Sequence, residues 1–296
     1  MKRKKIAAVL LITVMSLVGI LSGCGQNKVT DIINIATLNG PTGMGMASLM
    51  DETSKYNIKA YQSPDEVVSK IITGEVDLAA VPSNLAAVLY NKTDGQIVAV
   101  SAITLGVLYI MENGTEISDM SQLKGKTILA SGKGGTPEYV LQKVLEENGL
   151  ELGKDVKVEW LANHTEVMNK LIATDDTIAM LPEPFVTTCL KKDSGKVRIA
   201  FDMNALWKKE TGSDLPMGVL VAQKSFVEKR ESDLKIFLAD YGKSVKNLND
   251  DPSTAAKVIA EKGFIANAQI AEAAIPNCNI VLYEKGGSTT LLENFY

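Results

Sequence analysis

Two segments of the chain, residues 63–85 and 163–185, carry the same pattern at an offset of 100 residues. Each begins with a helix-capping box, continues with apolar residues at helical spacing, and ends in a short apolar strand closed by proline. The identical pairs are Glu66/Glu166, Val67/Val167, Lys70/Lys170, Ile72/Ile172, Ala79/Ala179 and Pro82/Pro182. Average composition predicts about one or two matches in such a window. Any two β-α-β units share some of this pattern. Whether the match is an internal repeat or only this general likeness, it predicts two similar α/β lobes.

The element that precedes each of these segments is also present twice. Residues 32–38 and 127–130 read as strands, and each is followed by a glycine-rich turn, residues 39–43 and 131–135. A helix begins after each turn, so each lobe runs strand, turn, helix, strand, helix, strand. Strands that alternate with helices form parallel sheets. We therefore expect an α/β fold of two lobes, each a mostly parallel sheet covered by helices, and 296 residues suffice for both.

Composition excludes several classes of chemistry. One histidine and three cysteines are too few for a zinc cluster or a disulfide scaffold. A net charge of −4 provides no basic field for nucleic acid. Cys189 and Cys278 lie near apolar stretches, and we expect both to be small buried residues rather than a disulfide or a nucleophile. We expect no metal site, no cofactor and no catalytic residue.

The N-terminus has the pattern of an exported protein. Four basic residues precede an uncharged apolar run from Ile6 to Leu21, which is shorter than the ~20 residues of a spanning helix. The run ends in Leu21-Ser22-Gly23-Cys24, which resembles a bacterial lipobox. The resemblance implies that residues 1–23 are a lipoprotein signal peptide and that the Cys24 thiol carries the lipid. An uncut membrane anchor or a chance cysteine is the alternative. We expect residues 24–30 to be a tether that holds the protein at the outer face of the cell membrane.

The candidate binding site lies in loops that follow the strands. Ligands of open α/β sheets lie beyond the carboxyl ends of strands, where helix N-termini present free N–H groups. If the two lobes face each other, the loops of both line one cleft. The candidate ligand-binding residues are Pro41, Thr42, Gly43, Met44, Gln62, Ser83, Asn84, Ser131, Lys133, Gly134, Gly135, Thr136 and Glu183. Each glycine by itself is also consistent with an ordinary tight turn.

The chemistry of these loops limits the ligand. The three arginines, Arg3, Arg198 and Arg230, all lie outside them, so a guanidinium clamp for an anion is not expected. An anion would be held by backbone N–H groups, hydroxyls and Lys133. Glu183 offers an acceptor for a cation or for an amino-bearing heterocycle, or is a solvated loop acid. The one histidine, His164, lies in the first turn of an expected helix, and a surface or cleft-edge position is expected for it.

Several motifs together resemble one known family. They are Gly40-Pro41-Thr42-Gly43, Asp119-Met120-Ser121-Gln122-Leu123-Lys124-Gly125-Lys126-Thr127-Ile128, Gly134-Gly135-Thr136-Pro137-Glu138-Tyr139 and Leu181-Pro182-Glu183-Pro184-Phe185. They are similar to ABC-transporter substrate-binding lipoproteins of the nitrate, sulfonate and taurine type, which include thiamine-pyrimidine binders. The similarity extends to about Tyr283, after which the family usually adds a further helix. Here residues 284–288 lead directly to Tyr296, so a shortened or altered end of the first lobe is expected.

The resemblance implies a periplasmic-binding-protein fold of the second type, whose chain crosses twice between lobes. We expect crossings near Thr104–Glu112 and Leu215–Gln223, with lobe I formed by residues 31–112 and 215–296 and lobe II by residues 113–214. Such proteins close on a solute by hinge motion.

The function implied is capture of a small organic solute and its delivery to an ABC permease and its ATPase. A sulfonate or a thiamine-type pyrimidine is favoured as the solute. The alternatives are a biosynthetic enzyme on the same fold, acting on a pyrimidine or a related small molecule, and a structural or adhesive lipoprotein.

Overall fold

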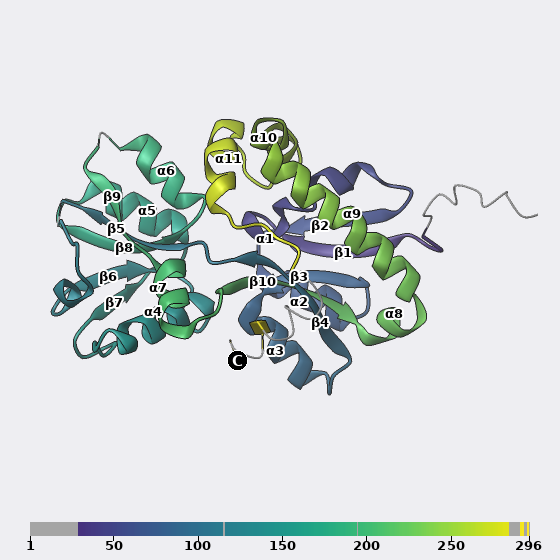
Figure 1. Ribbon diagram of the computed structural model, residues 1–296, viewed down its shortest axis with the longest axis horizontal. Coiled ribbons are helices and arrows are strands. Elements are labelled where there is room, and N and C mark those ends of the chain that lie inside the picture. Colours follow the sequence, from purple (N-terminus) through teal and green to yellow (C-terminus); the bar gives the residue numbers. More distant parts are fainter. Residues whose placement is uncertain (1–28, 115, 194, 284–290, 293–294, 296) are drawn as a thin grey trace, which may run out of the picture.

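The computed structural model of the chain describes residues 29–114, 116–193, 195–283, 291, 292 and 295. Figure 1 shows two lobes side by side, each built on one five-stranded sheet. The strand orders are β2-β1-β3-β10-β4 and β7-β6-β8-β5-β9, so the same arrangement occurs in both lobes. The expected signal peptide and lipobox, residues 1–24, lie outside the described residues, as does the expected end of the chain at residues 284–288.

Lobe I contains the first four strands and the last one. Strands β2 and β3 lie on either side of β1 and run parallel to it. Strand β10 lies between β3 and β4 and is antiparallel to both. Its strands are β1 (Ile33–Leu38), β2 (Tyr56–Tyr61), β3 (Leu78–Pro82), β4 (Ile97–Leu105) and β10 (Pro216–Gln223). Its helices are α1 (Pro41–Met44), α2 (Pro64–Ile72), α3 (Ser83–Lys92), α8 (Lys224–Lys229), α9 (Glu231–Asp250), α10 (Pro252–Glu261) and α11 (Ala268–Ala274), with the 3₁₀ turns η1 (Ala47–Asp51) and η3 (Ile275–Asn277).

Lobe II repeats this plan. In it β6 is parallel to β7 and β8, and β5 lies antiparallel between β8 and β9. The strands are β5 (Leu108–Asn113), β6 (Thr127–Ala130), β7 (Lys157–Trp160), β8 (Thr177–Pro182) and β9 (Val197–Asp202). The helices are α4 (Thr136–Glu147), α5 (His164–Ala173), α6 (Phe185–Lys192) and α7 (Met203–Thr211), with η2 (Met120–Leu123). The two-lobed α/β fold with mostly parallel sheets is confirmed, since in each sheet a single strand, β10 or β5, runs against the other four.

The duplicated capping pattern produces equivalent but not identical helix starts. Ser63 and Glu66 form a complete capping box at α2. At α5 the Asn163 side chain accepts the Glu166 N–H at 3.0 Å, but the Glu166 carboxylate accepts the N–H of Ala162, one residue before the N-cap. At α5 one bond of the expected capping box is therefore present, and the other is made to the residue before the N-cap.

Each sheet is covered by apolar side chains on both faces. In lobe I one cluster joins β1 and β3 to α9 and α10, and another lies under α2 and α3. In lobe II the corresponding clusters lie under α4 with α7 and under α5 with α6. Cys189 and Cys278 are free thiols within these clusters, as expected. Each lobe therefore has a core of its own.

The chain crosses between lobes close to Gly106. Strand β4 ends at Leu105 in the first sheet, and β5 begins at Leu108 in the second. Residues 108–112, which the sequence assigns to lobe I, thus belong to the second sheet. The return crossing precedes β10, and Leu215 still packs in the lobe II core. Residues 279–283 then lie along β4, where Val281 N–H donates to the Ile103 carbonyl at 3.1 Å.

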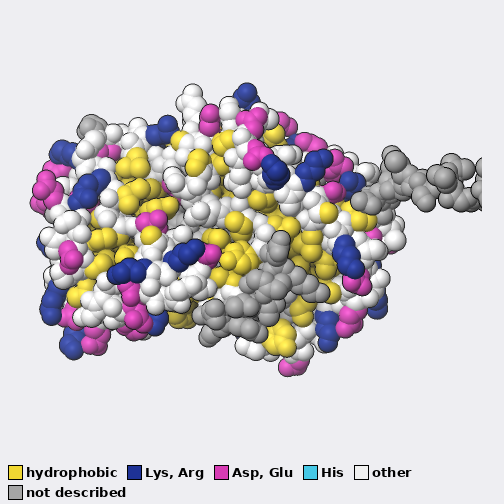
Figure 2. All heavy atoms as spheres, viewed as in Figure 1, with side chains coloured by type: hydrophobic (Ala, Val, Ile, Leu, Met, Phe, Trp, Pro, Cys, Tyr) yellow, Lys and Arg dark blue, Asp and Glu magenta, His cyan; other side chains and the backbone are white. Residues whose placement is uncertain are grey.

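The outer surface mixes charges of both signs. Figure 2 shows lysine and arginine side chains interspersed with aspartate and glutamate over the face in view. No helix among the described residues combines the length and the apolar character needed to cross a bilayer.

Candidate functional site

The starts of α3 and α4 meet directly between the two lobes. Ser83 is the first residue of α3 and Thr136 the first of α4, and their hydroxyl oxygens lie 3.1 Å apart. The Thr136 hydroxyl also donates to Asn84 Oδ1 at 3.0 Å. Ser83 is 0% and Thr136 2% exposed. The loops that follow β3 and β6 are thus together, and their polar side chains are buried against each other across the lobe boundary.

Neither of these helices begins with a side-chain cap. The N-cap residues are Pro82 for α3 and Gly135 for α4, and neither provides a side-chain acceptor for the first turn. By contrast, α2 and α5, which follow the edge strands β2 and β7, are capped by Ser63 and Asn163. In the first turn of α3 the Asn84 N–H faces the Thr136 hydroxyl oxygen at 3.5 Å. That oxygen occupies the place that an oxygen of a bound anion takes at a helix N-terminus.

The turn at residues 40–44 packs against the same edge of the first sheet. A side chain at Gly43 would place its Cβ 2.1 Å from the Leu38 carbonyl oxygen, so only glycine fits there. Thr42 lies beside the end of β10, where its methyl group would be 3.3 Å from a Cβ at Gly218. Pro41 accepts a long hydrogen bond from Thr104, at 3.4 Å, through its carbonyl.

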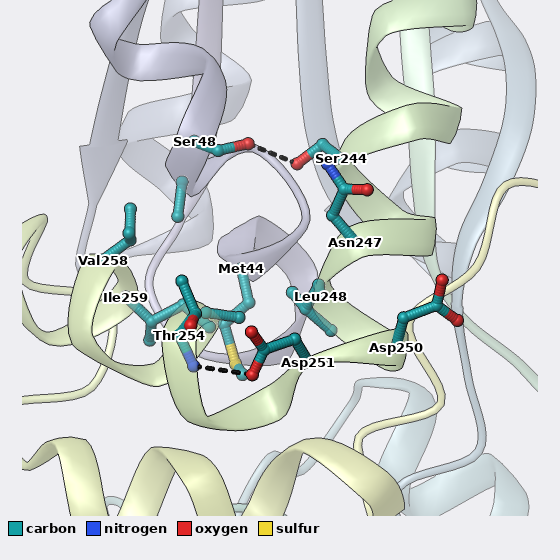
Figure 3. Close-up of a pocket in the computed structure, with 12 residues that line it drawn as sticks. Met44, Ser48, Ser244, Asn247, Leu248, Asp250, Asp251, Thr254, Val258 and Ile259 are labelled. Carbon is teal, nitrogen blue, oxygen red and sulfur yellow. Dashed lines mark hydrogen bonds between the residues drawn. The ribbon is translucent and has the colours of Figure 1, made fainter.

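Met44 does not face the other lobe. Figure 3 shows its side chain pointing into a pocket of about 400 Å³ within lobe I, between η1, α9 and α10. Met44 is 1% exposed and belongs to the lobe I core. Because α1 is a single turn, its last residue points away from the side that carries Thr42. The structure thus places this candidate in the core of its own lobe.

The buried Ser131 contacts the partly buried His164 on the lobe II side. Ser131 Oγ lies 2.6 Å from His164 Nδ1, and the imidazole packs on the Phe185 ring at 5.3 Å between centroids. Burial lowers the pKa of His164 to about 4, so the imidazole is neutral at neutral pH. The sequence placed His164 at a surface or a cleft edge. His164 is partly exposed, which is consistent with a cleft edge, and Ser131 and Phe185 from other elements cover part of its ring.

Glu183 is buried rather than solvated. It is 2% exposed, and its two carboxylate oxygens accept from the Thr187 N–H at 3.1 Å and the Thr187 hydroxyl at 3.0 Å. Burial raises the pKa of its carboxyl group, and hydrogen bonds from Thr187 and from Asn277 of lobe I oppose that rise. The interpretation of Glu183 as a solvated loop acid is therefore wrong. The carboxylate satisfies the first turn of α6, which has no cap of its own at Pro184.

The remaining candidates lie at or near the surface. Gln62, Lys133 and Gly134 are exposed, and Gly135 is half-buried. The Gly134 N–H is already bonded to the Glu138 carboxylate at 2.6 Å. None of these four residues takes part in the hydrogen bonds that join α3 to α4.

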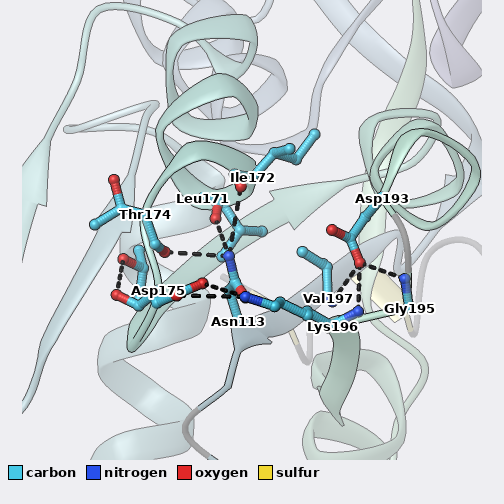
Figure 4. Close-up of polar contacts among 10 residues, drawn as sticks. Asn113, Leu171, Ile172, Thr174, Asp175, Asp193, Gly195, Lys196 and Val197 are labelled. Atoms are coloured by element: carbon cyan, nitrogen blue, oxygen red, sulfur yellow. Dashed lines mark hydrogen bonds and ion pairs between the residues drawn. The ribbon is translucent and has the colours of Figure 1, made fainter.

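No metal centre is found among the described residues, where no group of three or more histidine, cysteine or acidic side chains converges. Figure 4 shows a network of polar contacts in lobe II that includes Asp175 and Asp193, and both aspartates have structural roles. Asp193 accepts the N–H groups that begin β9, including Val197 N–H at 2.7 Å, and Asp175 pairs with Lys196 at 3.1 Å. Asn113 closes the end of α5 by donating to the Leu171 carbonyl at 2.9 Å.

Comparison with known proteins identifies the family. A sequence model described as "ABC transporter, phosphonate, periplasmic substrate-binding protein" matches residues 46–269. The chain belongs to this family. It is a family of substrate-binding proteins rather than of enzymes, which confirms at the family level the expectation of a non-enzymatic protein.

Solved structures share the two-lobed fold, and one curated relative matches part of the chain. An ABC transporter protein from Parabacteroides distasonis is 24% identical, with a TM-score of 0.74 and coverage of 89% of this chain and 90% of that one. The aliphatic sulphonate binding protein SsuA of Escherichia coli is 15% identical, with a TM-score of 0.72 and coverage of 89% and 84%. YtlA of Bacillus subtilis is 24% identical over 172 residues, which are 56% of this chain and 49% of YtlA. The chain thus spans about half the length of that curated relative.

A pocket between the lobes is a second feature that could hold a substrate. A pocket of about 690 Å³ has one wall from lobe II and one from lobe I. Pro184 and Phe185 line it on one side, and Ile265, Asn267 and Ile270 on the other. The Phe185–His164–Ser131 contacts connect it to the turn before α4. Sequence reasoning missed residues 265–270, because their loop follows a helix rather than a strand and has no glycine-rich signal.

Proposed function

We propose that the protein is the solute-binding component of an ABC importer and that it holds a small organic oxyanion, a sulfonate or a phosphonate, between its lobes. The observation that carries the proposal is the contact of Ser83 and Thr136 at the starts of two helices without side-chain caps. Both helices exceed two turns, so each presents the positive end of a dipole together with its first-turn amides.

The side chains around this contact suit an oxyanion. The hydroxyls of Ser83, Ser131 and Thr136 can each act as a hydrogen-bond donor or acceptor. The His164 imidazole beside Ser131 is neutral and donates through one ring nitrogen. The guanidinium groups of Arg198 and Arg230 form ion pairs with Glu112 and Asp233 elsewhere in the fold. An anion held here is therefore bound by dipoles and hydroxyls rather than by a full countercharge.

Closure follows from the position of the site. A solute at the α3–α4 contact touches both lobes, and only a ligand with different affinity for the closed and open states shifts the equilibrium between them. The crossing at Gly106 and Val107 joins the lobes beside the site, since the Glu183 N–H donates to the Val107 carbonyl at 3.0 Å. Hinge motion about this crossing would expose the helix starts to solvent and to the permease.

A pyrimidine is less favoured as the solute. The sequence argument for a heterocycle depends on Glu183 as a free acceptor, and both of its oxygens are engaged by Thr187. An oxyanion needs no such acceptor.

Membrane attachment is part of the proposal. The lipobox supports a lipid on Cys24, and Thr30, close to the start of the described residues, donates its N–H to Asp233 at 2.9 Å. Six residues of extended chain reach about 20 Å. Such a tether would hold lobe I close to the outer face of the membrane, beside a permease and its ATPase.

A solute screen tests the proposed function. The purified chain is heated with a panel of alkylsulfonates, alkylphosphonates and aminopyrimidines, and hits are confirmed by calorimetry. We expect raised melting temperatures for at least one oxyanion class, and mass spectrometry of co-purifying molecules should find a member of that class. Binding restricted to pyrimidines, or turnover of a panel compound, would refute the proposal.

A further inference from the structure

A short segment that follows η3, residues 279–283, is fixed along strand β4 of lobe I. The Asn279 carbonyl accepts the Leu105 N–H at 3.0 Å, and two further backbone hydrogen bonds of 3.1 Å join the segment to β4. Between them Ile280 is 1% exposed and packs in the lobe I core. In Figure 1 the yellow segment after η3 leaves the lobe boundary and runs across lobe I. By its backbone and its apolar side chains, the segment therefore belongs to lobe I.

One end of this segment contacts the first crossing between the lobes. Asn279 Nδ2 donates to the Gly106 carbonyl at 2.5 Å, and the next carbonyl, that of Val107, accepts the Glu183 N–H of lobe II at 3.0 Å. Asn204 of α7 packs directly on Gly106, since a Cβ at Gly106 would lie 2.5 Å from Asn204 Cγ. The crossing is thus held from lobe I by Asn279 and from lobe II by two other residues.

The other end of the segment contacts the second crossing. The Tyr283 hydroxyl donates to Asp214 Oδ2 at 3.0 Å. Asp214 immediately precedes Leu215, which packs in the lobe II core, and its second oxygen pairs with Lys208 of α7 at 2.8 Å. Asp214 is therefore attached to lobe II. Because Tyr283 is attached to lobe I, rotation of one lobe against the other about the crossings would change the length of this hydrogen bond.

The backbone of Asn279 is shaped for its contact with the crossing. Its φ is +45°, in the left-handed region that asparagine adopts more readily than most residues. A non-glycine residue persists in this region where its surroundings compensate for the strain. At Asn279 the compensation comes from the hydrogen bond of the side chain to Gly106 and from that of the carbonyl to Leu105.

We propose that residues 279–283 are a hinge strap that favours the closed arrangement of the lobes before any solute is bound. Asn279 and Tyr283 are positioning residues within it, because each joins lobe I to one of the two crossings in the orientation that brings Ser83 and Thr136 together. A solute that binds the closed state gains affinity from the strap, since a larger fraction of the empty protein is already in that state.

Single-molecule energy transfer on the empty protein tests the inference. Dyes are attached at Lys59→Cys of lobe I and Lys126→Cys of lobe II, both exposed positions, to measure the ratio of closed to open molecules. Tyr283→Phe removes only the hydroxyl, and Asn279→Gly removes the amide while it keeps a residue that adopts positive φ. We expect each variant to lower the ratio by about threefold or more, and the double variant to lower it further.

Two matched controls make the same kinds of change away from the crossings. Tyr56→Phe also deletes a tyrosine hydroxyl that donates to an aspartate, Asp240, at 2.7 Å, but both residues belong to lobe I. Asp94→Gly replaces another residue of positive φ, +48°, in the exposed turn between α3 and β4. Both controls should leave the ratio of closed to open molecules at the wild-type value, whatever they do to the melting temperature.

Two results would overturn the inference. One is a ratio in Tyr283→Phe and Asn279→Gly that equals the wild-type value or changes no more than in the matched controls. The other is a larger closed fraction in these variants, since the segment would then hold the lobes apart. Because no solute is present, either result leaves the proposed function standing, and a failed solute screen leaves the hinge strap standing.

Discussion

Replacement of Thr136 by valine removes the hydroxyl that joins the lobes while it keeps the size of the side chain. Thr136 Oγ1 is 3.1 Å from Ser83 Oγ and 3.0 Å from Asn84 Oδ1, and both partners belong to the other lobe. A neutral hydrogen bond contributes about 0.5–1.5 kcal/mol net, so two contribute about 1–3 kcal/mol. This energy favours only the closed arrangement. The ratio of closed to open molecules should therefore fall by roughly 5- to 150-fold.

The assay is single-molecule energy transfer between dyes at the exposed positions Lys59 of lobe I and Lys126 of lobe II, each replaced by cysteine. Without solute, Thr136→Val should shift the population toward the low-transfer, open state. Thr93→Val is the matched control, because Thr93 also makes two hydrogen bonds, to the Leu89 carbonyl and from the Ile97 N–H, but within lobe I. If the two variants shift the population equally, or not at all, the contact does not stabilise closure and the reasoning fails.

Three further changes have expected outcomes. Gly43→Ala should lower stability by about 2 kcal/mol or more and the melting temperature by several degrees, because its Cβ would lie 2.1 Å from the Leu38 carbonyl oxygen; an unchanged melting curve would contradict this. The contribution of His164 to the free energy of unfolding should fall by about 2 kcal/mol between pH 7 and pH 4.5, because the unfolded residue takes up a proton near pH 6.5 and the folded residue only near pH 4. In urea titrations, His164→Phe should remove this part of the acid sensitivity. Cys24→Ser should release the protein from the membrane fraction into the soluble fraction of expressing cells, and equal retention of both forms would argue against a lipid anchor.

Glu183 should change the stability with pH in the opposite direction to His164. Burial raises the pKa of Glu183, so the folded state binds a proton more readily than the unfolded state there. The contribution of Glu183 to stability therefore falls as the pH rises through its folded pKa, whereas that of His164 falls as the pH drops. Comparison of the His164 and Glu183 variants across one pH series separates the two.

Local signals predicted much of the fold because they act within a few residues. Ser63, Pro64 and Glu66 cap α2 through contacts inside one turn, and the structure has them as expected. The two repeated strand–turn–helix units fold alike because the same apolar spacing covers the same faces of each sheet. The exact crossing was not predictable, since the apolar residues of β4 and β5 run on almost continuously and Gly106 is the main break.

Long-range contacts decided the positions that the sequence misjudged. Met44 turns into lobe I because α9 and α10, about 200 residues later in the chain, supply an apolar pocket for it. The partial burial of His164 likewise depends on distant residues, Ser131 after β6 and Phe185 of α6. Glu183 had a usable local signal: an acid four residues before Thr187 at a helix start can cap that helix from within.

Amide hydrogen exchange with and without a bound oxyanion tests most directly whether a solute bridges the lobes. With ethanesulfonate, or whichever oxyanion the screen identifies, at saturation, slowed exchange is expected in residues 83–85 of lobe I and in residues 131–136 of lobe II at the same time, while α9 is unchanged. Protection in one lobe alone, with binding confirmed by calorimetry, would contradict the account.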